Sequence, residues 1–275
     1  MDMTSAANPA SARAGFTRFV VIGQGRSGST LVSTALANHP RIRMHGEVFN
    51  HEPNARREAF SGIYAESGRW KGAEPECYKD GVDGEQFLRE VVFAEPNPDD
   101  YEAVGFKMIY GQTETDAASR RAWSYLESDP AIKVIHVRRD NLMAGLVSYQ
   151  TALRTRSWAV FVADDSRRAP EPELVLQPEG CESYFRWVYK SQQRLREAFA
   201  HHRFCEVVFE RDLVEEFAAT SDRLQDFIGV PRVALAPVTK RQSEKPWPRR
   251  VVNFEQLRAH FQNTEYGRFF TVEST

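Results

Sequence analysis

The chain is poor in cysteine and has no long hydrophobic run, and each absence excludes a class of protein. Only three cysteines occur among its 275 residues (Cys77, Cys181 and Cys205), and no two form a CxxC pair. This argues against a disulfide framework and a cysteine-based metal site, and it is typical of a reducing compartment. No stretch of about 18 apolar residues is present, so we expect no membrane span.

Neither sign of charge dominates the composition. The chain has 36 Lys and Arg against 38 Asp and Glu, a formal net charge of −2. Because a nucleic-acid-binding protein usually carries a clear basic excess, we expect no nucleic-acid partner. The N-terminal residues lack the apolar segment of a secretory signal. We therefore expect a globular cytoplasmic protein.

The order of predicted elements favours an α/β fold. Short apolar runs rich in β-branched residues predict buried strands over 18–23, 103–109, 132–137 and 204–210. Helical patterns lie between and after these strands, over 29–38, 84–93, 116–128, 140–155, 183–200 and 212–228. Alternation of strands with helices predicts a doubly wound parallel sheet flanked by helices.

The remaining segments are polar and rich in Pro or Gly. Residues 1–15 are predicted to be a disordered arm, and 16–275 a single domain. Within that domain, 50–82 is predicted to be an irregular insertion and 161–182 a long loop. Loops of this length are often functional lids or mobile segments, so we expect both near an acceptor site.

A glycine-rich turn joins the first strand to the first helix. The phosphate-loop pattern GxxxxGK[ST] matches at Gly23, Gly28 and Thr30, but Ser29 stands where the lysine belongs. The cation of the turn is instead Arg26. Glycines allow the backbone to wrap an anion, and a helix N-terminus directs free N–H groups and a positive dipole end at it. The turn therefore predicts an anion site.

The charge of this turn suggests which anion it binds. No acidic residue ends a strand where a second magnesium ligand would be expected, and the nearest, Asp140, is separated from the strand by two arginines. A sulfuryl group carries less charge than a terminal phosphate and needs less neutralisation. These features favour sulfuryl transfer from a phosphosulfate, without a metal.

A second anion site is predicted after the third strand. Arg138 and Arg139 follow the run 132–137, and Ser148 lies on the next helix. Ligands of open α/β sheets bind at the carboxyl ends of strands, and an arginine with a serine hydroxyl suits a nucleotide 3′-phosphate. A surface salt bridge with a solvated serine is the alternative interpretation.

A candidate general base follows the first helix. Glu47, next to the flexible Gly46, could take the proton of an attacking hydroxyl. His45 is the rival base because its usual pKa is nearer neutrality.

Three segments together resemble sulfotransferases that use 3′-phosphoadenosine 5′-phosphosulfate (PAPS). "GRSGSTLVSTALANHPRIRMHGEVFN" resembles their 5′-phosphosulfate-binding segment, "VIHVRRDNLMAGLVSYQTALRTRSW" their 3′-phosphate-binding segment, and "CEVVFERDLVEEF" a later strand and acidic turn. Further features resemble those of bacterial carbohydrate sulfotransferases of the nodulation-factor type. They are the pair "RR", the later serine, "TR-x-W" and the tail from 240 to 270. The resemblance extends from about residue 17 to 271.

This resemblance implies a P-loop-like fold, PAPS as donor, adenosine 3′,5′-bisphosphate as product, and no metal. Glu47 would be the base, and Arg26 would stabilise charge. Ser148 would hold the 3′-phosphate together with one of the two arginines. Many members place this serine eight residues after the arginine, whereas Ser148 lies ten residues after Arg138 and nine after Arg139. The spacing therefore leaves open which arginine is its partner. The resemblance implies further donor contacts from Gly25, Ser27, Gly28, Ser29 and Thr30, and from Lys240 and Arg241 in a closing basic segment.

The resemblance also implies a carbohydrate hydroxyl as acceptor, with the 6-hydroxyl of an N-acetylglucosamine unit in a chitin-like oligosaccharide suggested. Other polysaccharides, glycolipids or secondary metabolites are the alternative acceptors. Trp70 and Trp158 are candidate sugar-stacking platforms. A P-loop kinase with a displaced lysine and a non-catalytic nucleotide-binding module are the competing functions.

Overall fold

The computed structural model describes residues 15–50, 83–94, 100–162, 171–240, 243 and 245–271. The predicted arm and the predicted insertion lie outside these residues, apart from Gly15 and Asn50. Trp70 and Arg241 also lie outside them.

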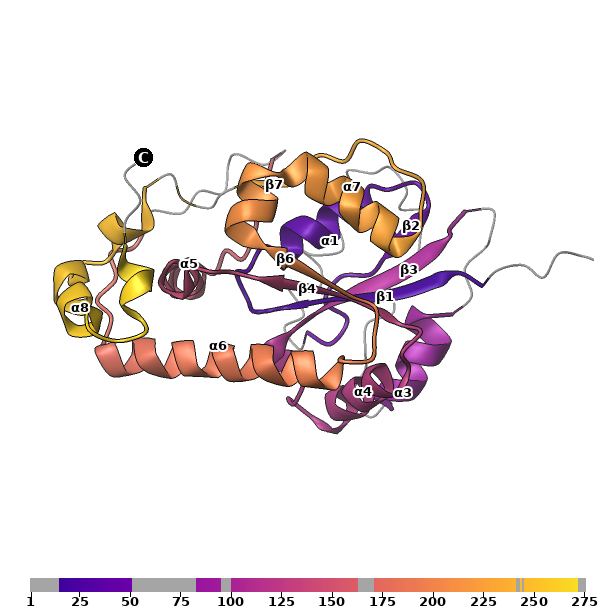
Figure 1. Ribbon diagram of the computed structural model, residues 1–275, viewed down its shortest axis with the longest axis horizontal. Coiled ribbons are helices and arrows are strands. Elements are labelled where there is room, and N and C mark those ends of the chain that lie inside the picture. Colours follow the sequence, from indigo (N-terminus) through magenta and orange to yellow (C-terminus); the bar gives the residue numbers. More distant parts are fainter. Residues whose placement is uncertain are drawn as a thin grey trace, which may run out of the picture.

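The core of the fold is a parallel sheet in the order β2-β3-β1-β4-β6, so the doubly wound prediction is confirmed (Figure 1). Four of these strands were predicted to within two residues at each end. The exception is β2, which is three residues long and too short to give a periodic signal. The strands are β1 (Thr17–Gly23), β2 (Ile42–Met44), β3 (Ala103–Ile109), β4 (Lys133–Arg138) and β6 (Phe204–Val208).

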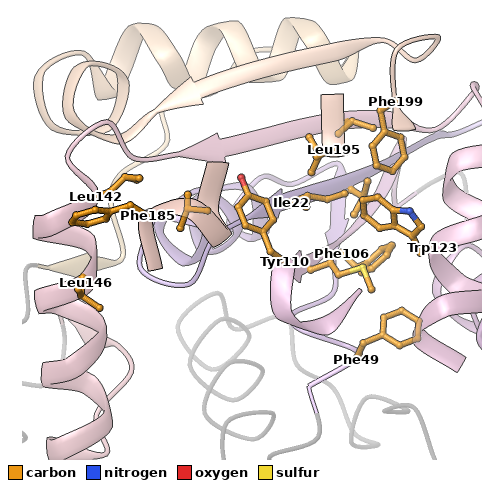
Figure 2. Close-up of a cluster of buried hydrophobic side chains, with 14 of the residues drawn as sticks. Ile22, Phe49, Phe106, Tyr110, Trp123, Leu142, Leu146, Phe185, Leu195 and Phe199 are labelled. Carbon is orange, nitrogen blue, oxygen red and sulfur yellow. The ribbon is translucent and has the colours of Figure 1, made fainter. Parts of the chain in front are cut away.

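Helices cover both faces of the sheet because successive strand residues point to opposite sides. Phe19 and Val21 of β1 pack in the cluster beneath α1 (Ser29–Ala37) and α7 (Phe217–Ile228). Val20 and Ile22 pack in the larger cluster that includes side chains of α4 (Ala117–Ser128) and α6 (Pro178–Ala198). Figure 2 shows part of this second core, where Phe106, Tyr110, Trp123 and Phe199 gather around Ile22.

The C-terminal part of the chain packs beside α5 (Leu142–Thr155), the helix after β4 (Figure 1). It contains α8 (Phe254–Phe261) and two short 3₁₀ helices, Trp247–Arg250 and Gly267–Phe270. A small antiparallel ribbon pairs β5 (Val160–Phe161) with β7 (Thr239–Lys240). Apart from α5, none of these elements was predicted.

Some element boundaries differ from the prediction. Helix α6 begins at Pro178, so the predicted loop 161–182 is wrong over its last five residues. A proline suits the first turn of a helix because its missing N–H has no partner there in any case. The predicted helix 84–93 is a short α3 (Gly84–Phe87) continued by a π-turn over Leu88–Val92. A second π-helical segment, Phe209–Glu215, precedes α7. In the described part of the chain, no helix is long and apolar enough to cross a membrane.

One glycine of the sheet has a direct test. Gly105 of β3 is in register with Phe19 of β1, and a β-carbon at position 105 would lie 2.3 Å from the Phe19 ring. Gly105→Ala should therefore lower the free energy of unfolding by about 1–3 kcal/mol through overpacking. The matched control is Gly111→Ala, where a β-carbon meets nothing within 4 Å. Urea denaturation should separate the two variants, and equal midpoints would contradict the packing argument.

Candidate active site

The loop between β1 and α1 is shaped by glycines. Any other residue at Gly23 or Gly28 would force neighbouring atoms to shift. At Gly23 a β-carbon would lie 2.3 Å from the carbonyl oxygen of Val137 in β4. Gly28 has φ 92°, and a β-carbon there would lie 2.7 Å from side-chain atoms of Leu213 and Phe209. The loop therefore folds tightly against the ends of its neighbouring strands, with Gly28 as the N-cap of α1.

Arg26 projects from this loop towards α5. It has a left-handed backbone with φ 70°. Its Nε donates to Ser148 Oγ at 3.0 Å, and its Nη1 donates to the carbonyl oxygen of Trp158. Burial, and then the nearby positive charges of Arg139 and Arg250, lower the pKa of Arg26 to about 10. The two predicted anion-binding segments thus meet at one place.

A buried lysine joins the loop to the predicted base. Lys107 lies on β3 with only 5% of its surface exposed, and it donates from Nζ to Thr30 Oγ1 at 2.7 Å. The same ammonium group forms an ion pair with Glu47 Oε1. The backbone sets this contact, because the chain after β2 continues beside β3. The N–H of His45 donates to Gly105, and the N–H of Lys107 donates to Gly46.

The second oxygen of Glu47 is held by two amides. Asn50 Nδ2 donates to Glu47 Oε2 at 2.8 Å, and Gln112 Nε2 donates to it at 3.0 Å. Burial by itself would raise the pKa of Glu47, but the charge and hydrogen bond of Lys107 and the two amides together lower it. Glu47 is therefore ionised at neutral pH. A carboxylate has about four lone-pair sites, so one near Oε1 remains to accept a hydrogen bond from a substrate hydroxyl.

His45, the rival base, lies in a different environment. It is 8% exposed, and burial followed by the charge of Arg43 lowers its pKa to about 3. The Nε2 atom of its ring is buried and has no hydrogen-bond partner among the described residues. Among the described residues, Lys107 connects Glu47 to the loop, and no such contact joins His45 to it.

The two arginines after β4 point to different partners. Arg138 Nε donates to Glu206 Oε1 of β6 at 2.8 Å, and Arg138 also pairs with Asp140. Arg139 lies over the Phe209 ring at 4.6 Å, with Glu210 Oε1 3.3 Å from its Nε. Of these two arginines, Arg139 is the one whose charge lowers the pKa of Arg26.

The other predicted site residues lie around this centre. Ser27 and Ser29 are buried in the loop, and the hydroxyl of Ser27 has no hydrogen-bond partner among the described residues. Lys240 lies in the β5–β7 ribbon, where it is in register with Val160. Val160 follows Trp158 by two residues. Trp158 is 38% exposed and its ring lies 5.9 Å from that of Tyr149. A β-carbon at Gly25 would be 3.9 Å from Tyr149.

Several residues of the site were missed. Lys107 had a visible signal, since a lysine in the apolar strand "AVGFKMI" is rarely buried without a partner. Gln112 and Arg250 gave none, because an amide or an arginine in a polar segment is ordinary. The fold alone brings them to Glu47 and Arg26.

A parallel α/β sheet with a glycine-rich loop, a helix N-terminus and a cluster of cations defines an anion-binding protein of the phosphate-loop type. The chain is similar over nearly its whole length to Nodulation protein H of Rhizobium meliloti, with 29% identity over 262 residues, covering 92% of this chain and 95% of that protein. Nodulation protein H of Rhizobium tropici is 24% identical, covering 93% of each. The predicted resemblance to the nodulation type is confirmed by these relatives.

Solved structures and family models were also compared. A sulfotransferase from Alicyclobacillus acidocaldarius aligns with TM-score 0.44 and 14% identity, covering 90% of this chain and 92% of that one. The sulfotransferase domain of the Synechococcus PCC 7002 olefin synthase aligns with TM-score 0.43 and 16% identity, covering 81% and 77%. No model of a known protein family matches the chain.

The Lys107–Glu47 pair predicts a strong energetic coupling. Lys107→Met leaves a buried carboxylate without its counter-ion and should lower the free energy of unfolding by about 3–5 kcal/mol. In a Glu47→Gln background the same change should cost much less, because no buried charge is left unpaired. Urea denaturation of both single variants and the double variant measures the coupling. Equal costs of Lys107→Met in the two backgrounds would show that the ions do not interact.

The lowered pKa of Glu47 predicts how stability depends on pH. The folded-state pKa lies below the ordinary value of 4.5. Stability from the ionised carboxylate is therefore fully present above pH 4.5 and is lost as the pH falls through the lowered pKa. Below pH 4.5 the wild-type protein should lose stability faster than Glu47→Gln. Thermal unfolding across pH 3–6 checks this (roughly the carboxylate titration range), and parallel curves would contradict it.

Proposed function

We propose that this protein is a sulfotransferase that moves the sulfuryl group of PAPS to a hydroxyl of a carbohydrate. The observation that carries the proposal is the ionised Glu47 held against the anion loop. Lys107 bridges Glu47 to Thr30, the first threonine of α1. A base beside an anion cradle is what an acceptor hydroxyl and a transferable anionic group both require. The similarity to Nodulation protein H over nearly the whole chain supports the same proposal.

The reaction proposed is an in-line displacement. Glu47 accepts the proton of the acceptor hydroxyl while that oxygen forms a bond to sulfur. The bond between sulfur and the 5′-phosphate oxygen breaks, and its electron pair leaves on that oxygen to give adenosine 3′,5′-bisphosphate. Arg26 and the loop N–H groups stabilise the charge that develops on the phosphate.

The environment of Glu47 suits this step in two ways. Lys107 and the two amides keep the carboxylate unprotonated and fix its orientation. Lys107 also places a second positive charge beside Thr30, near the negative transferring group. The donor's 3′-phosphate is assigned to Arg139 and Ser148, because Arg138 is engaged by Glu206 and Asp140.

The acceptor is assigned from the nodulation-type resemblance. We place the sulfate on the 6-hydroxyl of an N-acetylglucosamine unit of a chitin-like oligosaccharide, the alternatives being other polysaccharides, glycolipids and secondary metabolites. The direct assay combines the protein with PAPS and chitotetraose without added metal and follows the product by mass. ATP-dependent phosphorylation with Mg²⁺ would favour a kinase, and PAPS binding without transfer to a broad acceptor panel would favour a binding module.

Glu47→Gln tests the base. This variant should lose about 10²–10⁴-fold in kcat while its affinity for adenosine 3′,5′-bisphosphate stays within a few-fold of wild type. Its matched control is Glu102→Gln, which makes the same change in a glutamate paired with Arg41. Glu102 lies just before the first residue of β3, at the end of the strand away from the candidate site. Near-normal turnover of Glu47→Gln would remove Glu47 from the mechanism.

A further inference from the structure

Arg250 is a buried cation that the proposed function has not yet used. It is the last residue of the 3₁₀ helix Trp247–Arg250 and is 7% exposed. Its Nη1 donates to Thr151 Oγ1 at 3.2 Å, whereas its Nε is buried and has no hydrogen-bond partner among the described residues. No carboxylate in that part of the chain forms an ion pair with it. A buried charge in this state is costly, and such groups usually have a ligand or a counter-ion.

Arg250 has charged neighbours of both signs. Burial lowers its pKa, the charge of Glu171 raises it, and the charge of Arg139 lowers it. The charge of Arg250 in turn lowers the pKa of Arg26. Three arginines from the β1 loop, the end of β4 and the C-terminal segment therefore lie within electrostatic reach of one another. Their mutual repulsion would be relieved by a bound anion.

The hydroxyl groups of α5 complete the site. Ser148 and Thr151 are three residues apart, so they lie on the same face of the helix. Ser148 accepts a hydrogen bond from Arg26, and Thr151 accepts one from Arg250. The Thr151 hydroxyl donates its proton to the carbonyl oxygen of Val147 at 2.8 Å, so it orients Arg250, and the Ser148 hydroxyl is the one that can donate to an anion.

The position of Arg250 is fixed by its backbone. Its carbonyl oxygen accepts from the N–H of Leu174 at 2.8 Å, and the N–H of Val252 donates to the carbonyl oxygen of Leu174 at 2.9 Å. Asn253 then exchanges hydrogen bonds with the backbone of Leu176. The guanidinium is therefore held in place before any ligand binds, which lowers the entropic cost of binding.

We propose that Arg250 is a specificity-determining residue of the donor site, which binds the 3′-phosphate together with Arg139 and Ser148, while Thr151 orients its guanidinium group. The inference rests on the proposed function. A phosphate carries between one and two negative charges and three acceptor oxygens, which match a buried guanidinium and a serine hydroxyl. A nucleotide with a free 3′-hydroxyl offers no charge to Arg250, so Arg250 should select 3′-phosphorylated nucleotides.

The test compares adenosine 3′,5′-bisphosphate with adenosine 5′-monophosphate by calorimetry. Arg250→Gln should weaken the bisphosphate by about 10- to 100-fold, the range for loss of a hydrogen bond to a charged group, and leave the monophosphate almost unchanged. The matched control is Arg249→Gln, the same change at the exposed neighbouring residue, which should keep wild-type selectivity.

Folding is checked by the melting temperature without nucleotide. Because Arg250 is buried without a counter-ion, Arg250→Gln should melt at or above the wild-type temperature, and a lower value would assign Arg250 a structural role. If the wild-type protein binds the bisphosphate and Arg250→Gln binds it equally well, the role of Arg250 is overturned while the donor assignment stands. If the wild-type protein binds neither nucleotide, the proposed function itself fails.

Discussion

The buried ion pair between Lys107 and Glu47 is the interaction on which the rest of the site depends. Lys107 lies inside a core strand, where an ammonium group without a partner would be strongly destabilising. Its partners come from two other parts of the chain, Glu47 after β2 and Thr30 at the start of α1. Satisfying one buried charge therefore fixes three segments relative to one another. The same contact keeps the carboxylate ionised.

The opposite imbalance occurs on the α5 side of the loop. There Arg26, Arg139 and Arg250 lie within electrostatic reach of one another, with Glu210 beside Arg139 and Glu171 near Arg250. The fold can keep three arginines close together because each belongs to a different element, whose own backbone hydrogen bonds fix its position. We propose that this repulsion makes the cluster receptive to an anion. The site thus combines a neutralised acid–base pair with an excess of positive charge.

The sequence predicted much of the fold because its strands are strongly apolar. The runs that became β1, β3 and β4 are buried on both faces, and this leaves a signal in any window. The elements that were missed are short or lie in polar segments, such as β2 and the 3₁₀ helix that carries Arg250. The glycine loop was predicted because only a particular backbone can make that turn. Apart from the neighbouring Asn50, the partners of Glu47 and the charge of Arg250 beside Arg26 were not, because they are 60 to more than 200 residues away in sequence.

The sequence by itself determined the doubly wound sheet, the anion loop with an arginine in place of the usual lysine, and the candidate base. Each of these depends on local features, namely apolar periodicity, glycine content and the spacing of a few residues. Only the tertiary structure gives Arg138 and Arg139 different partners, gives Glu47 and His45 different environments, and brings Lys107 and Arg250 to the candidate site. The reason is that hydrogen bonds and charges act through space. Which side chains share a site is decided by the order of the strands and the packing of the C-terminal segment on α5.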